Sequence, residues 1–194
     1  MYFPEDMNFQ YFFFNTYIGY FLQLIPVALI AGLACFFIRR KRKHREGTWR
    51  TLLASLFIAY LSAVVTITLF QNLLGDIYYW LFYHRPSGRI YRWFEFVYSF
   101  RLDFFRHLTM ENLFNVVLFL PFGILYPFFD RNAGWKKTLG VGVLTSLAIE
   151  LIQPILGRSF DINDIALNSI GVLLSTGIFF GIWALTGRRA RPQS

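Results

Sequence analysis

The chain has 194 residues, of which 56% are hydrophobic and only 15% are charged. Soluble domains carry about 25% charged residues, so this composition excludes a water-soluble domain of the same length. The formal charge of +8 does not indicate a nucleic-acid partner, because the basic residues flank apolar stretches, as the orientation signals of membrane proteins do. The only cysteine is Cys35, so an intramolecular disulfide is excluded.

Five apolar stretches are long enough to cross the roughly 30 Å hydrocarbon layer of a membrane. They predict an all-α, polytopic membrane helix bundle that forms a single domain over residues 1–194. The five predicted spans are 12–38, 50–71, 113–129, 137–157 and 165–186.

The connection 72–112, between the second and third spans, is rich in aromatic residues interleaved with Arg and Glu. Such a segment is typical of the headgroup level, with rings in the membrane boundary and charges in water. Two interpretations stay open. The connection is either a linker that follows the membrane surface, or a lid or platform over a site at that surface.

Basic residues predict the orientation of the chain. Most Lys and Arg residues lie in the linker 39–50, in the connection after the third span, and in the C-terminal tail. With five spans, these three segments lie on the same side of the membrane, and the positive-inside rule assigns that side to the cytoplasm. We therefore expect the N-terminus outside and the C-terminus in the cytoplasm.

Polar side chains gather where the fourth span ends and the fifth begins. With a helical rise of about 1.5 Å per residue, they and two residues at the start of the third span fall in the outer half of the membrane. An ionisable residue in a span is costly and indicates a functional site. We expect these residues to bind a ligand in an outward-facing polar cavity: Asn112, Asn115, Glu150, Gln153, Arg158, Asp161, Asp164 and Asn168.

Prolines weaken two of the helices that carry this cluster. Pro154 offers no N–H to the carbonyl of Glu150, and Pro121 offers none to the carbonyl of Val117. Freed backbone groups are tolerated within a membrane where they are buried in protein or line a water-filled cavity. The prolines therefore favour a cavity over solid packing.

Structural roles compete with ligand binding for several of these residues. Asp161 could cap a helix that begins near Ile162, with Asp164 in its first turn. Arg158 could pair with Glu150 or an aspartate and only hold the fourth and fifth helices together. In the fifth span, small residues indicate tight packing within the bundle rather than dimerisation; they are Gly171, Ser175, Gly177 and Gly181.

Motifs for known metal and nucleotide sites are absent from the sequence, which has no H-E-x-x-H, C-x-x-C or P-loop. Its three histidines, His44, His84 and His107, are scattered and are interpreted as interfacial or solvated side chains. We therefore expect no metal site and no resident cofactor. No catalytic nucleophile is recognisable.

The segments 111–127 and 146–171 resemble the VanZ-like family, bacterial integral membrane proteins named after a teicoplanin-resistance determinant. The resemblance is strongest over about residues 60–186, although residues 93–100 lack a proline that relatives often have. It implies a bacterial cell membrane protein with a role in resistance to teicoplanin-type glycopeptides, or in a related envelope function, without supplying a reaction. It rests on Asn115, Phe119, Pro121, Gly123, Glu150, Gln153, Gly157, Arg158, Asp161, Asp164, Asn168 and Gly171.

Three functions follow as hypotheses, and the oligomeric state stays open in each. The first is a non-enzymatic envelope protein that binds membrane lipid and a lipid-linked wall precursor or lipoglycopeptide. The second is an enzyme acting on a lipid-linked phosphate or wall precursor. In it Glu150 or Asp164 is general acid or base, Arg158 stabilises phosphate charge, and Asp161 and Asp164 hold Mg²⁺. The third is a scaffold whose polar cluster only assembles the bundle.

Overall fold

The computed structural model describes residues 9–42, 47–94, 96–106 and 109–186. Within these residues, five helices are long and apolar enough to cross a membrane, which confirms the predicted all-α membrane bundle. The chain is therefore a multi-pass membrane protein. The five helices are α2 (Tyr17–Arg42), the continuous helix Thr48–Tyr83, α5 (Met110–Phe129), the helix Trp135–Leu156 that contains α6 (Trp135–Ile152), and α7 (Ile162–Leu185).

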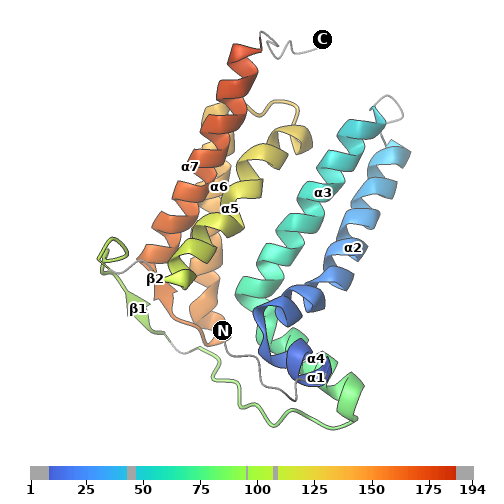
Figure 1. Ribbon diagram of the computed structural model, residues 1–194, viewed down its shortest axis with the longest axis vertical. Helices are drawn as coiled ribbons and strands as arrows, with labels where there is room; N and C mark the ends of the chain where they lie inside the picture. Colours follow the sequence, from blue (N-terminus) through green and yellow to red (C-terminus); the bar gives the residue numbers. More distant parts are fainter. Residues whose placement is uncertain (1–8, 43–46, 95, 107–108, 187–194) are drawn as a thin grey trace.

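The second span is longer than the sequence predicted. It consists of α3 (Thr48–Val65), a π-helical segment (Thr66–Phe70) and α4 (Gln71–Tyr83). Residues 72–83 are therefore helical, and the prediction that they belong to the connection is wrong. The π-helical segment marks the change of direction, because α4 turns away from the axis of α3 (Figure 1).

The first span is divided at Thr16 into α1 (Phe9–Asn15) and α2. The hydroxyl of Thr16 accepts a hydrogen bond from the Gly19 amide at 3.0 Å and donates to the Phe12 carbonyl at 2.7 Å. A side chain at position 19 would collide with the backbone of α1, so the bend requires glycine there. The bend lays α1 beside α4 at the lower end of Figure 1.

The helices form two groups, α2 with α3 and α5 with α6 and α7 (Figure 1). Buried aromatic side chains join the groups, with Phe57 of α3 packing edge-on against Phe122 of α5. The closest approach is between α5 and α7. A Cβ at Gly123 would overlap Ser175 and Thr176, and one at Gly171 would meet the backbone of Val116.

The small residues of α7 therefore serve two different surfaces. Gly171 and Ser175 are buried within the bundle, as the sequence predicted. Gly177 and Gly181 are exposed, and a Cβ at either position would meet only open space. The prediction that this second pair packs within the bundle is wrong, because the helices that cover the first half of α7 do not cover this face.

The described parts of the connection 84–109 cross one end of the bundle, where α5 and α7 begin and α6 ends. We call this the cavity end. Its short strand β1 (Tyr98–Ser99) pairs in parallel with β2 (Phe160–Asp161). The Phe94 amide also donates to the Ile155 carbonyl at 3.1 Å. The predicted fourth and fifth spans left residues 158–164 as the segment between them, and the sequence indicated no pairing partner for it. We call the other end, where α3 and α6 begin, the basic end.

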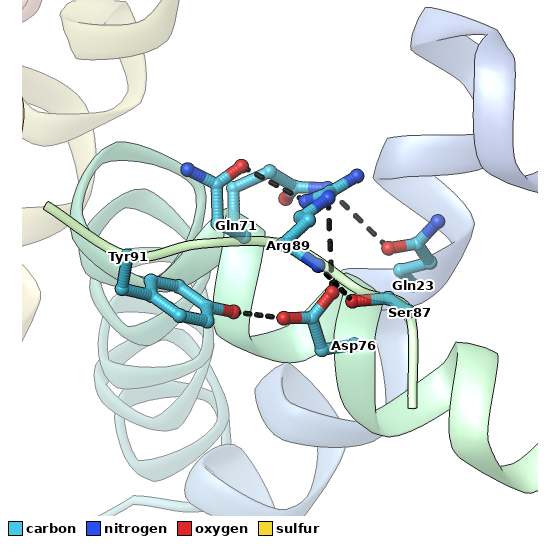
Figure 2. A network of polar contacts seen from close by, with 7 residues as sticks. Gln23, Gln71, Asp76, Ser87, Arg89 and Tyr91 are labelled. Carbon is cyan, nitrogen blue, oxygen red and sulfur yellow. Dashed lines mark hydrogen bonds and ion pairs between the residues drawn. The ribbon is translucent and has the colours of Figure 1, made fainter. Parts of the chain in front are cut away.

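A polar network ties the start of this connection to the helices, and Figure 2 shows it at close range. Asp76 on α4 accepts a hydrogen bond from the Tyr91 hydroxyl and lies 3.7 Å from the guanidinium of Arg89. Burial and the bond to Asp76 raise the pKa of Tyr91 to about 12. Gln23, buried on α2, accepts from the Gln71 amide at 3.3 Å.

Candidate functional site

A cavity of about 670 Å³ lies at the cavity end. Its walls come from α2, the π-helical segment, the connection 84–109, α5, the helix Trp135–Leu156, the loop before α7, and α7 itself. The structure brings all the binding residues predicted from the sequence to this one cavity. They are Asn112, Asn115, Glu150, Gln153, Arg158, Asp161, Asp164 and Asn168. That they bind a ligand stays a prediction.

Glu150 forms the buried centre of one wall, with 2% of its surface exposed. Its Oε2 accepts a hydrogen bond from the Asp161 backbone amide at 3.0 Å. One end of the Gln153 amide lies 2.9 Å and 3.2 Å from the two carboxylate oxygens and 3.2 Å from the Ser159 carbonyl. Three acceptors around that end identify it as the amide nitrogen.

Pro154 explains why Gln153 can turn back toward Glu150. The α-helix α6 ends at Ile152, and the chain continues as a 3-10 helix over Gln153–Leu156. The expected disruption of the fourth span at this proline is therefore confirmed. Proline has no N–H to bond to the Glu150 carbonyl, so the α-helical hydrogen bonding ends within one turn of the carboxylate.

Asp161 has the capping role that the sequence offered as one of two interpretations. Its side chain accepts from the Asn163 amide at 2.9 Å, and its backbone is extended, as an N-cap requires. Asp161 also lines the cavity. The capping role therefore does not remove this carboxylate from the site.

Asn163 is a site residue that the sequence interpretation missed. Its amide oxygen accepts from the backbone amides of Asp103 and Phe104 at 3.0 and 3.2 Å. Its amide nitrogen donates to the Arg101 carbonyl at 2.8 Å. The buried side chain thus fastens the connection 84–109 to the start of α7. Its position beside a helix cap was the only signal, and polar residues are ordinary there.

Two asparagines link different helices around the cavity. Asn115 on α5 donates to the Asp164 carboxylate on α7 at 2.5 Å. Asn168 on α7 donates to the Ser146 hydroxyl on α6 at 2.9 Å. Asn168 is 4% exposed, and its Oδ1 accepts no hydrogen bond from any described group. A buried acceptor without a partner is uncommon and calls for an explanation.

Arg158 points toward the π-helical segment, where its guanidinium donates to the Thr68 carbonyl at 2.8 Å. No ion pair joins Arg158 to a carboxylate among the described residues. The alternative interpretation, in which Arg158 pairs with Glu150 or an aspartate, is therefore not met among these residues. π-helical turns leave carbonyls without their usual helical donors and are frequent at functional sites, and Thr68 also lines the cavity.

The model of the VanZ/LLP1 family matches residues 57–184 of the chain, about two-thirds of its length. The chain belongs to the VanZ/LLP1 family. The matched range includes every predicted binding residue and confirms the resemblance seen in the sequence. No curated protein and no solved structure is significantly similar to the chain.

One wall of the cavity in this VanZ/LLP1 protein is aromatic, and its α2 residues lie outside the matched range. Tyr17 and Phe21 of α2 face the cavity beside Phe114 of α5. The Tyr17 and Phe114 rings stack with their centroids 5.4 Å apart, and both side chains are exposed. Because α2 and α5 are membrane helices, this side of the cavity adjoins the lipid.

Metal ligands do not gather in the part of the VanZ/LLP1 chain that the structure describes, where no group of three or more His, Cys, Asp or Glu side chains could hold an ion. The Asp161 carboxylate is engaged in capping, and that of Asp164 in the bond to Asn115. His84 ends α4 and does not line the cavity. His44 and His107 lie outside the described residues.

Proposed function

We propose that this VanZ/LLP1 protein binds a lipid-linked or amphiphilic ligand in its cavity. The supporting observation is the division of one 670 Å³ cavity into a polar wall on α5, α6 and α7 and an aromatic wall that includes Tyr17, Phe21 and Phe114. Ligand pockets measure about 300–1,000 Å³ and combine apolar surface with a few convergent polar groups. A ligand with a polar head and an apolar chain suits both walls.

The proposed biological role is envelope homeostasis or glycopeptide (teicoplanin) resistance in a bacterial cell membrane. Family membership supports this role, since the family takes its name from a teicoplanin-resistance determinant. Candidate ligands are a lipid-linked wall precursor and the lipid tail of a lipoglycopeptide. Binding either one at the membrane surface would change the amount of free antibiotic or free target there.

This role requires the cavity to face outward, and we propose that orientation. Its support is the distribution of basic residues, because Arg39, Arg40, Lys136 and Lys137 all lie at the basic end. Under the positive-inside rule that end is cytoplasmic. The N-terminus would then be outside and the C-terminus in the cytoplasm.

Susceptibility to teicoplanin tests the proposal in cells. The variants Glu150→Gln, Arg158→Ala and Asp164→Asn are expressed singly in a strain that lacks the gene. Each is expected to lose the resistance that the wild-type protein confers while its abundance in the membrane stays unchanged. Asp130→Asn, at the basic end and away from the cavity, is the matched control.

Two results would overturn the proposal. Wild-type resistance in all three variants would show that the cavity is not used. A loss of protein before any loss of resistance in Glu150→Gln would favour a scaffold, because the polar cluster would then serve only to assemble the bundle.

An enzymatic function is the second candidate, favoured by two carboxylates, Glu150 and Asp164, that face the same cavity from different helices. One could donate and the other accept a proton during turnover of a lipid-linked precursor. Purified protein is incubated with labelled undecaprenyl-linked precursors, with and without Mg²⁺. Conversion that disappears in both Glu150→Gln and Asp164→Asn would establish the enzyme, and unchanged substrate throughout would exclude it.

A further inference from the structure

The side chains that line the cavity include more acidic than basic groups. Among the described lining residues, Arg158 alone is cationic, whereas five side chains are carboxylates. A phosphate or carboxylate ligand would enter against the field of these groups, which is weakly screened in a site set into the membrane. The carboxylates belong to Asp103, Glu111, Glu150, Asp161 and Asp164.

The three carboxyl groups nearest the junction of α6 and α7 are oriented by hydrogen bonds and form no ion pair. None of them lies within ion-pair distance of a cation among the described residues. Arg158 is directed to a backbone carbonyl instead. Charges placed in this way are costly unless a cation joins them. Each accepts a hydrogen bond from an uncharged amide: for Glu150, Asp161 and Asp164 these are the amides of Asp161, Asn163 and Asn115, respectively.

Asn168 independently indicates that the cavity lacks a hydrogen-bond donor. This residue lines the cavity, is 4% exposed, and uses its amide nitrogen to bind Ser146. Its Oδ1 is buried and accepts no hydrogen bond from any described group. A free acceptor at this position calls for a ligand that brings a donor. A phosphate, which offers acceptors when ionised, would leave it unsatisfied.

We infer that the cavity recognises a primary ammonium group at the head of its amphiphilic ligand. An ammonium carries one positive charge and three N–H donors and has no acceptor. It complements both the carboxylates and the orphaned oxygen of Asn168, which a phosphate does not. The aromatic wall receives the apolar chain. This inference rests on the proposed binding function and names the chemistry of the head group.

Three amphiphiles with the same chain separate charge from hydrogen bonding. The probes are dodecylammonium, dodecyltrimethylammonium and dodecyl phosphate. Their binding to the full-length protein in phosphatidylcholine nanodiscs is measured by calorimetry, with empty nanodiscs subtracted. Dodecylammonium is expected to bind about tenfold or more tighter than dodecyl phosphate, the equivalent of one charge-assisted hydrogen bond. Dodecyltrimethylammonium, which has the charge without donors, is expected to fall between them.

Two variants locate the effect within the cavity. Asp164→Asn is expected to weaken dodecylammonium about tenfold and to leave dodecyl phosphate unchanged or tighter. Asn168→Leu removes the free acceptor while keeping the side chain's volume, and it is expected to reduce the preference for dodecylammonium over dodecyltrimethylammonium. Asp130→Asn, whose substituted carboxylate lies at the basic end, is expected to change neither the affinity for dodecylammonium nor the preference over dodecyltrimethylammonium. The preference of the wild-type protein does not depend on how well the variants fold.

Tighter binding of dodecyl phosphate than of dodecylammonium would overturn the inference. So would an unchanged preference in Asp164→Asn, because the charge would then act from elsewhere. Mg²⁺ binding that disappears in Asp164→Asn would overturn it in favour of a metal site. Binding of dodecyl phosphate that depends on Arg158 would refute the specificity for an ammonium group but leave the proposed binding function intact. If none of the three probes binds, both the ammonium specificity and the proposed binding function are refuted.

Discussion

The two ends of the bundle hold their charged side chains in different ways. At the basic end, Arg39 and Arg50 donate to the carbonyls of Phe129 and Pro127, where α5 ends. Cations are favourable at a helix C-terminus, where carbonyls lack helical partners. At the cavity end, carboxylates such as Glu150 are buried and held by uncharged amides.

This difference separates charges that stabilise the fold from charges that belong to the candidate site. The arginines at the basic end meet acceptors that the fold already presents. The carboxylates that line the cavity surround a space and form no ion pair among the described residues. Ionisable groups at membrane depth without such partners indicate a functional site. Substitutions at the two ends should therefore affect different properties.

The largest expected effect is on the packing that supports the cavity end. Gly171→Val should destabilise the protein by about 3 kcal/mol, because a side chain there meets the backbone of Val116 and forces α5 and α7 apart. Thermal unfolding in detergent measures the change. Gly177→Val, in the same helix but facing open space, is the control and should change stability little. Equal losses in both variants would contradict the close approach.

Removing the side chain of Asn163, which holds the connection 84–109 to α7, should lower the stability somewhat less. Asn163→Ala deletes the hydrogen bonds to Arg101, Asp103 and Phe104 and should destabilise the protein by about 2 kcal/mol. Proteolysis within residues 84–109 should become faster, and mass spectrometry of the fragments locates the cut. Asn132→Ala, on an exposed turn at the basic end, should leave both measurements unchanged. Faster cleavage elsewhere in the chain would contradict the role of Asn163 in holding this connection.

A pair of arginine variants compares the two ends directly. Arg50→Ala should lower the free energy of unfolding by about 0.5–1 kcal/mol, since it loses a bond to the Pro127 carbonyl, and should keep any resistance. Arg158→Ala should instead lose any resistance and change the free energy of unfolding little, because its exposed guanidinium contributes more to the cavity than to the fold. Unfolding curves and susceptibility tests on both variants check this. A resistance loss in Arg50→Ala alone would invert the comparison.

The smallest expected effect is a pH dependence at the basic end. The Lys137 ammonium, 2.5 Å from Asp130 Oδ2, holds the pKa of Asp130 below its ordinary range. The ionised form is favoured by folding, so its contribution is present above the ordinary aspartate pKa of about 3.9 and is lost as the pH falls through the lowered value. The stability difference between wild type and Asp130→Asn should shrink below about pH 4. A constant difference across that range would exclude the linkage.

Local physical rules made part of the site predictable. Pro154 ends α6 because proline opposes helical backbone, and Asp161 caps α7 because its short side chain reaches a free amide. Helical rise and topology then predicted that residues from different spans lie at one depth. These inferences need only near neighbours in the chain or the thickness of the membrane.

Contacts between distant segments were not predictable in the same way. Asn163 looked like an ordinary first-turn residue, yet it binds a segment about sixty positions earlier in the chain. Arg158 looked ready for an ion pair but donates to Thr68. Gly177 resembled Gly171 in spacing but faces open space. Spacing specifies which face of a helix a residue occupies, but not which helix covers that face.

The sequence by itself determined the five membrane helices and the polar residues concentrated at one depth, because apolar length and the cost of buried charge are local properties. Tertiary structure alone decided three features: the packing of α5 on α7 at Gly171, the pairing of β1 with β2, and the absence of an ion pair at Glu150 among the described residues. These depend on how separate segments meet. The excess of acidic over basic groups around the cavity is therefore a property of the assembled bundle.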